Sequence, residues 1–92
     1  MTTAKITPAA AFDQLEEQAR SLLAELGERM AHARSGAGFT QASLADALRV
    51  SIRSVSRWEN GASDPSLIDL RAFAQLTGRP LRWLRTGAGR MA

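Results

Sequence analysis

The chain has 92 residues, a formal net charge of +3 at pH 7 and no cysteine. A chain of this length forms one small domain with little apolar core to spare. Without cysteine, disulfides and thiolate metal sites are excluded, and we expect no metal and no cofactor. No stretch has the hydropathy of a signal peptide or of a membrane-spanning helix, so we expect a cytoplasmic protein with no membrane partner.

The charge is distributed unevenly along the chain. Residues 1–25 contain two basic and four acidic residues, a net charge of −2, whereas residues 26–92 contain ten arginines and five acidic residues, a net charge of +5. A basic body favours a polyanionic partner, because binding releases counterions. Basic surfaces are common, so the charge supports a nucleic-acid partner without identifying one.

Residues 1–25 are predicted to form an N-terminal helical arm. Thr7 and Pro8 are typical of a helix start, a capping hydroxyl followed by proline at the first helical position. Apolar residues then recur at the alternating spacing of a short coiled-coil seam; they are Phe12, Leu15, Ala19, Leu22 and Leu26. Such a seam must be buried against something. Two interpretations stay open: the arm folds back on its own domain, or it pairs with the arm of a second subunit.

Residues 26–34 are predicted to form the first helix of the globular part, with Leu26, Met30 and Ala33 facing inward. Whether this helix continues the arm is open, because Gly27 costs a helix interior on the order of 1 kcal/mol relative to alanine. The Ser- and Gly-rich run at 35–38 then predicts a loop.

Residues 40–61 are predicted to form two short helices joined by a tight turn. Thr40 and Ser51 are suitable N-cap residues, because a hydroxyl there accepts a hydrogen bond from a first-turn N–H. Apolar residues at helical spacing indicate the buried faces; they are Leu44, Ala45 and Leu48 in the first helix and Val55 and Trp58 in the second.

The second of these helices has a separate outward side. The residues on it are Ile52, Arg53, Ser56 and Arg57. The two arginines are four residues apart, so they project from the same side of the helix. A helix-turn-helix with two arginines on its outer face is typical of a protein that reads DNA.

Two more helices are predicted after a loop at 62–65. Ser66 and Asp69 have the spacing of a capping box, and the helix that they begin ends at Gly78. Pro80 precedes a last short helix, and residues 88–92 form a basic tail. Trp58 and Trp83 match the apolar stripes, which favours core positions over stacking platforms.

Three segments carry a resemblance to a known family. Thr40–Ala45, Leu48–Ser51 and Glu59–Gly61 resemble the helix-turn-helix of the Cro/CI-type (XRE) family of phage repressors and bacterial regulators, and the likeness covers about residues 26–87. It implies an all-α, five-helix repressor-like bundle. It also implies sequence-specific binding of double-stranded DNA by a homodimer on a palindromic operator, with regulation of transcription, most simply repression, as the outcome.

The resemblance assigns roles to individual residues. It places Ile52, Arg53, Ser56 and Arg57 at base edges in the major groove. It places Thr40, Gln41, Arg49, Ser51 and Asn60 at phosphates. It pairs Arg34 with Glu59 in a structural ion pair. Arg49 departs from the family, which prefers glycine because the turn needs a positive φ, so either the turn is reshaped or Arg49 is strained.

Other functions have weaker support in the sequence. His32 is the lone histidine, and together with the lack of cysteine this leaves no material for a nucleophilic triad or a zinc site, so we do not expect an enzyme. The alternative function is an antitoxin-like or adaptor protein whose arm binds another protein, with DNA binding serving autoregulation. As a regulator, the protein would be bacterial or phage-encoded and associated with the nucleoid.

Overall fold

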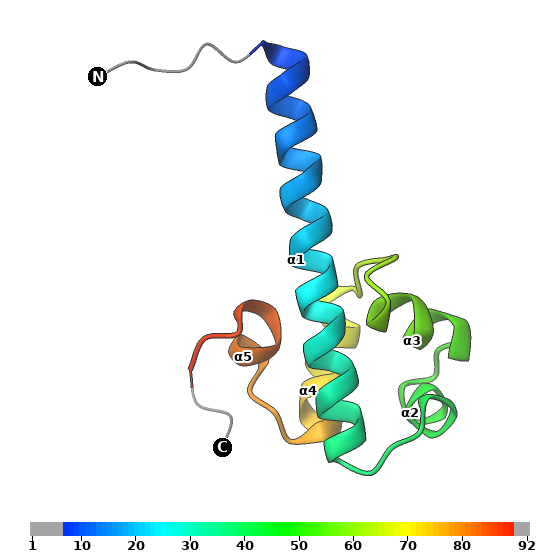
Figure 1. Cartoon of the computed structure of the whole chain (residues 1–92). Helices are drawn as coiled ribbons and strands as arrows, with labels where there is room; N and C mark the ends of the chain where they lie inside the picture. Colours follow the sequence, from blue (N-terminus) through cyan, green and yellow to red (C-terminus); the bar gives the residue numbers. More distant parts are fainter. Residues whose placement is uncertain (1–6, 90–92) are drawn as a thin grey trace.

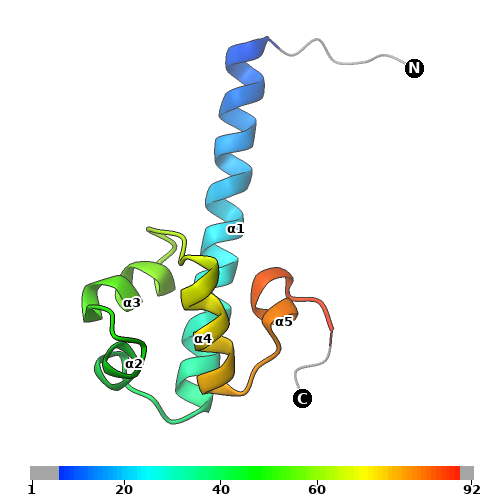
Figure 2. The same ribbon diagram turned by 180° about the vertical axis from the view of Figure 1, so that it is seen from behind.

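The computed structural model describes residues 7–89, so the first six residues of the predicted arm and the last three of the predicted tail lie outside the described residues. Five helices account for all the secondary structure of residues 7–89: α1 (Pro8–Gly36), α2 (Gln41–Leu48), α3 (Ile52–Glu59), α4 (Leu67–Thr77) and α5 (Leu81–Thr86). The all-α fold class is confirmed. Figure 1 shows α2 and α3 on one side of α1 and α5 on the other, and Figure 2 shows α4 packed across α1.

α1 is one continuous helix of 29 residues that joins the arm to the globular part. It begins as predicted, with Pro8 at its first position and the Thr7 hydroxyl accepting a hydrogen bond from the Ala10 N–H at 3.1 Å. Gly27 does not interrupt it. A Cβ at this position would lie 2.5 Å from the carbonyl oxygen of Trp58 and 2.6 Å from that of Glu59, so glycine is what allows the end of α3 to pack directly on α1.

The core lies between the five helices, where α1 packs against α3, α4 and α5 and α2 packs against α3 and α4. It contains residues from all five, namely Leu26, Met30, Ala33, Leu44, Ala45, Val55, Trp58, Leu70, Phe73, Ala74 and Leu84. Every position predicted to face inward on residues 26–34 is buried. Trp58 belongs to this core and Trp83 is half-buried against it, as predicted.

The caps of the short helices follow the sequence closely. Thr40 and Ser51 each accept a hydrogen bond from a first-turn N–H. At Ser66 the predicted capping box forms in one direction, in which the Ser66 hydroxyl accepts from the Asp69 N–H at 3.1 Å. A complete box forms instead at α2, where the hydroxyl of Ser43 accepts from the Thr40 N–H at 2.9 Å.

The arm projects away from the bundle, and two expectations about its seam are corrected. Figure 1 shows the described part of the arm extending away from the bundle, so it does not fold back. Phe12, Leu15 and Leu22 are each more than 60% exposed. Leu26 is not a free contact residue of the seam, because it is only 8% exposed and belongs to the core of its own domain. The available seam is therefore the stretch from Phe12 to Leu22.

Candidate nucleic-acid interface

The turn between α2 and α3 keeps a left-handed residue that is not glycine. Arg49 has φ 59° and ψ 41°, and its N–H donates to the carbonyls of Ala45 and Asp46. The N–H of Val50 also donates to Ala45, at 3.0 Å. Of the two outcomes predicted for this position, the structure shows the strained one: the turn retains its geometry and Arg49 adopts a conformation that an L side chain resists.

α3 is strongly amphipathic, with one face in the core and one in solvent. Val55 is fully buried and Trp58 is 6% exposed, and these two residues fix the rotation of the helix. On the opposite side Arg53 and Arg57 are exposed and Ile52 is 53% exposed. Three of the four residues predicted to read bases therefore face solvent, whereas the fourth, Ser56, is half-buried.

The two arginines of α3 are held differently. A guanidinium Nη2 of Arg57 donates to the carbonyl of Ala62 at 3.2 Å, which draws this side chain toward the loop after α3. Among the described residues, Arg53 has no hydrogen-bond or salt-bridge partner. Arg53 is thus free to bind a ligand directly, whereas Arg57 has one exposed hydrogen bond to exchange.

A largely buried ionic cluster joins the end of α3 to α1. Arg34 and Glu59 form the ion pair that the family resemblance implies, with Nε to Oε2 at 2.6 Å and Nη2 to Oε1 at 3.0 Å. Their side chains are 18% and 6% exposed. The hydrogen bond to the Glu59 carboxylate raises the pKa of Arg34 above its usual value, because it stabilises the charged guanidinium. Arg34 also donates to the carbonyl of Phe39 at 2.8 Å.

Gln41 belongs to this cluster, which the sequence did not indicate. Its side-chain Nε2 donates to Glu59 Oε1 at 3.0 Å, so the amide expected at a phosphate is engaged inside the protein. The cluster joins α1, α2 and α3 and fixes α3 relative to its neighbours. The carboxylate of Glu59 accepts two hydrogen bonds from Arg34 and one from Gln41, which leaves little freedom for the end of α3.

The other residues predicted to contact phosphates lie on the surface. Thr40 begins α2, Arg49 lies in the turn and Ser51 begins α3, and all three are exposed. Asn60 is exposed at the end of α3, where its Nδ2 donates to the Ser56 hydroxyl at 3.4 Å. The N-termini of both helices of the unit thus have free surface beside the exposed arginines.

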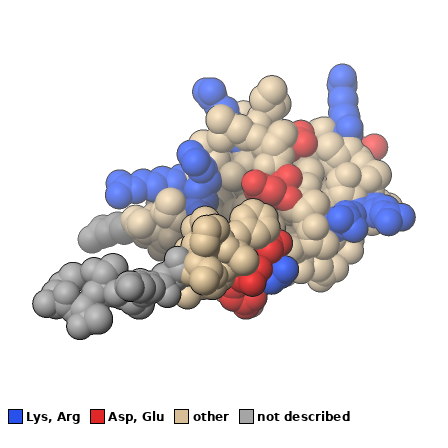
Figure 3. Space-filling model, turned by 90° about the horizontal axis from the view of Figure 1, so that it is seen from above, with Lys and Arg blue, Asp and Glu red and all other residues tan. Residues whose placement is uncertain are grey.

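Viewed down the arm, arginine side chains project from the rim of the molecule, while most of the visible Asp and Glu side chains lie nearer the middle (Figure 3). Within residues 7–89, no group of three or more His, Cys, Asp and Glu could hold a metal ion, and His32 is exposed. No helix of the described part of the chain is long and apolar enough to cross a bilayer.

Two helices joined by a tight turn, the second with an exposed cationic face, define a helix-turn-helix, a DNA-binding motif. Residues 31–84 match the model of the family described as helix-turn-helix, and since this is more than half of the chain, the protein belongs to that family. The chain is 39% identical over 62 residues to the HTH-type transcriptional regulator DicA of Escherichia coli (strain K12). The alignment covers 67% of this chain and 46% of the relative, so the chain spans less than half of that protein's length.

Proposed function

We propose that this protein is a transcriptional regulator that binds double-stranded DNA sequence-specifically through α3. The observation that carries the proposal is the rotation of α3, in which Val55 and Trp58 lie in the core and Arg53 and Arg57 lie in solvent. A helix of this kind enters the major groove with its outer side chains against the base edges. The family membership and the likeness to a transcriptional regulator support the same reading.

In this proposal the side chains of α3 have different roles in recognition of the DNA. Arginine donates two hydrogen bonds to O6 and N7 of guanine, a contact worth roughly 1–3 kcal/mol of discrimination. Arg53 has no partner to release among residues 7–89, so it is the principal base reader, and Arg57 joins it by exchanging its hydrogen bond to Ala62. Ile52 contacts a thymine methyl group, and Ser56 lies behind these residues and reaches the groove least.

Phosphate contacts would hold α3 at the correct depth. Thr40, Arg49, Ser51 and Asn60 supply them from exposed positions, and the N-termini of α2 and α3 add free N–H groups and the favourable end of the helix dipole. For Gln41 only the backbone N–H is assigned to a phosphate, because its side chain donates to Glu59.

The functional unit in this proposal is a homodimer on a palindromic operator. Two copies place their α3 helices in successive major grooves about 34 Å apart, so the dyad of the protein coincides with that of the site. Occlusion of a promoter on the nucleoid is the simplest way for such a dimer to act, which makes repression the favoured outcome.

The test is selection of preferred sites from random duplex DNA at a fixed salt concentration. We expect a two-fold symmetric site whose half-site centres lie about one helical turn apart. The variant with Arg53→Ala and Arg57→Ala should lose its ranking of sequences and keep weak, salt-sensitive association with random duplex. Arg71→Ala is the matched control, because Arg71 is an exposed arginine on α4. A double variant that ranks sequences as the parent does would refute the assignment.

A second candidate function rests on the exposed seam of the arm. Phe12, Leu15 and Leu22 are apolar and in solvent, which also suits an antitoxin-like or adaptor protein that captures another protein. The oligomeric state of the purified chain separates the two proposals. A monomer would favour the adaptor, and a symmetric dimer would favour the regulator.

A further inference from the structure

The exposed apolar residues of this chain lie mainly on two elements. Of the seven large hydrophobic residues that are exposed among residues 7–89, three lie on the arm and two begin α4; these five are Phe12, Leu15, Leu22, Leu67 and Ile68. Their exposure runs from 61% to 81%. On the arm they follow the seam, and an exposed apolar stripe of this kind marks an interaction site.

A groove continues the seam of the arm into the globular part. It is lined by Ala19, Leu22, Leu23, Leu26, Asp64 and Arg85. One wall is therefore α1, and the others are the loop before α4 and the end of α5.

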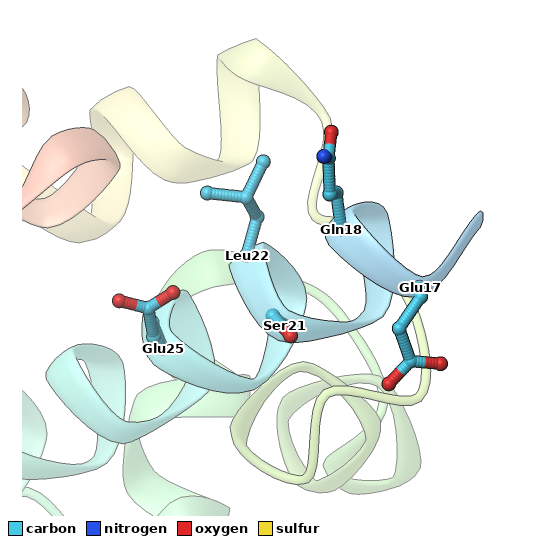
Figure 4. Close-up of a pocket in the computed structure, with 5 residues that line it drawn as sticks. All are labelled: Glu17, Gln18, Ser21, Leu22 and Glu25. Carbon is cyan, nitrogen blue, oxygen red and sulfur yellow. The ribbon is translucent and has the colours of Figure 1, made fainter. Parts of the chain in front are cut away.

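A second hollow lies on the neighbouring flank of the arm and shares Leu22 with the groove. It is lined by residues of α1 alone, namely Glu17, Gln18, Ser21, Leu22 and Glu25, and Figure 4 shows the carboxylates of Glu17 and Glu25 on this flank. A partner helix would therefore lie against the seam and the groove, with this acidic flank left in solvent.

We propose that the seam and the groove form a dimer interface in which the arms of two copies pair antiparallel. The first turns of each α1, residues 8–15, then lie in the groove of the other copy. This inference rests on the proposed function, since it supplies the interface of the homodimer that binds the operator.

The spacing of the seam residues favours the antiparallel orientation. With the two-fold axis at residue 17, Phe12 lies opposite the partner's Leu22, and Leu15 lies opposite the partner's Ala19. Phenylalanine then packs against leucine in one layer of the interface, and leucine packs against alanine in the next. In a parallel pair, Ala19 would face the partner's Ala19 and leave a void, which an apolar interface does not tolerate without loss.

The charges favour the same orientation. Arg85 of the groove and Asp13 of the arm have no ion-pair partner within the described residues. In the antiparallel pair Asp13 lies level with the partner's Ser21, at the height of the groove that contains Arg85 and one position off the seam. A parallel pair would instead set the acidic ends of both arms side by side. Within each copy, Arg20 bonds Glu17 at 3.1 Å and lies 3.9 Å from Glu16, which partly neutralises these carboxylates.

The geometry of α1 also fits the spacing of DNA grooves. The end of α3 packs on α1 at Gly27, ten residues from the proposed axis. At a rise of 1.5 Å per residue this is about 15 Å, so the two α3 ends lie about 30 Å apart along the arms, close to the 34 Å between successive major grooves. A parallel pair sets both copies at the same level and has no such spacing.

A distance between two spin labels tests the orientation directly. The chain contains no cysteine, so Ala9→Cys gives one exposed labelling site per copy. Antiparallel arms place the two labelled positions at least about 24 Å apart along the helix axis, whereas parallel arms place them roughly 10 Å apart. The full chain is measured without DNA by electron paramagnetic resonance. A short distance, or a monomer at all concentrations, would overturn the proposal.

Substitutions test the two halves of the interface. Leu15→Glu should abolish the dimer in sedimentation equilibrium, while Gln14→Glu, which adds the same charge one residue off the seam, should not. Arg85→Glu should weaken the dimer about threefold to tenfold, and adding Asp13→Arg should restore it. Arg82→Glu is the control, because Arg82 is exposed on α5 and does not line the groove. An Arg85→Glu variant that dimerises as the parent does contradicts the charge pairing.

The site selection distinguishes failure of this inference from failure of the proposed function. A selected operator together with a short label distance would leave DNA binding intact and refute the antiparallel arms. A long label distance with no preferred sequence would support the interface and refute the regulator.

Discussion

Replacing Arg49 with glycine should stabilise the fold. Arg49 holds φ 59° at the end of α2, where an L side chain costs roughly 1–2 kcal/mol and glycine costs nothing sterically. Glycine also loses more conformational entropy on folding, which takes back about 0.5–1 kcal/mol. The net gain expected for Arg49→Gly is therefore about 0.5–1 kcal/mol in the free energy of unfolding, or a rise of a few degrees in Tm, since about 1 kcal/mol corresponds to roughly 4–8 °C in a domain of this size.

The measurement is thermal and urea unfolding followed by circular dichroism, with Arg49→Ala as the control. Alanine removes the charge and keeps the Cβ, so it should leave the free energy of unfolding nearly unchanged. Both variants lack the cation, and both should show weaker DNA binding with a salt dependence reduced by about one phosphate contact. If alanine stabilises as much as glycine, the gain comes from charge and the strain argument fails.

Two further substitutions test the packing beneath α3. Gly27→Ala should destabilise the protein by about 1–3 kcal/mol or more, because the new Cβ would meet the carbonyl oxygens of Trp58 and Glu59 at 2.5 and 2.6 Å. Gly36→Ala is the control and should be neutral or stabilising, because its Cβ would meet only a flexible arginine side chain. Urea titration compares the free energies of unfolding of the two variants. Glu59→Gln should cost about 2–3 kcal/mol because it leaves the Arg34 guanidinium without its carboxylate, and a double-mutant cycle with Arg34→Met should show a coupling of that order. Additive effects in that cycle would refute the buried pair.

The sequence predicted the globular part well because local signals and hydrophobic pattern agree there. Thr40 and Ser51 cap the helices expected of them, and Val55 and Trp58 occupy the core and thereby orient α3. Helical periodicity fixes which side of α3 faces inward, so it also placed Arg53 on the outside. Spacing alone was sufficient for that part of the candidate site.

The features that sequence did not predict depend on contacts between elements. Gly27 was expected only to weaken a helix, and only the approach of α3 reveals why glycine is needed there. Gln41 was assigned to a phosphate, yet its amide donates to Glu59, eighteen positions away in sequence. Leu26 fits both the seam of the arm and the stripe of the first helix, and periodicity cannot choose between them because one continuous helix carries both.

Because α1 is continuous, the arm is joined rigidly to the globular part of the protein. α3 packs on this continuous helix at Gly27. Because no hinge separates the arm from Gly27, a change in the length of the arm changes the distance between its first turn and α3. Each residue inserted before Gly27 would move the first turn of α1 about 1.5 Å further from α3 and rotate it by about 100° about the helix axis. In the proposed dimer, only insertions close to whole turns would preserve the phase of the seam, so the distance between the two α3 helices would change in steps of about 5 Å per copy.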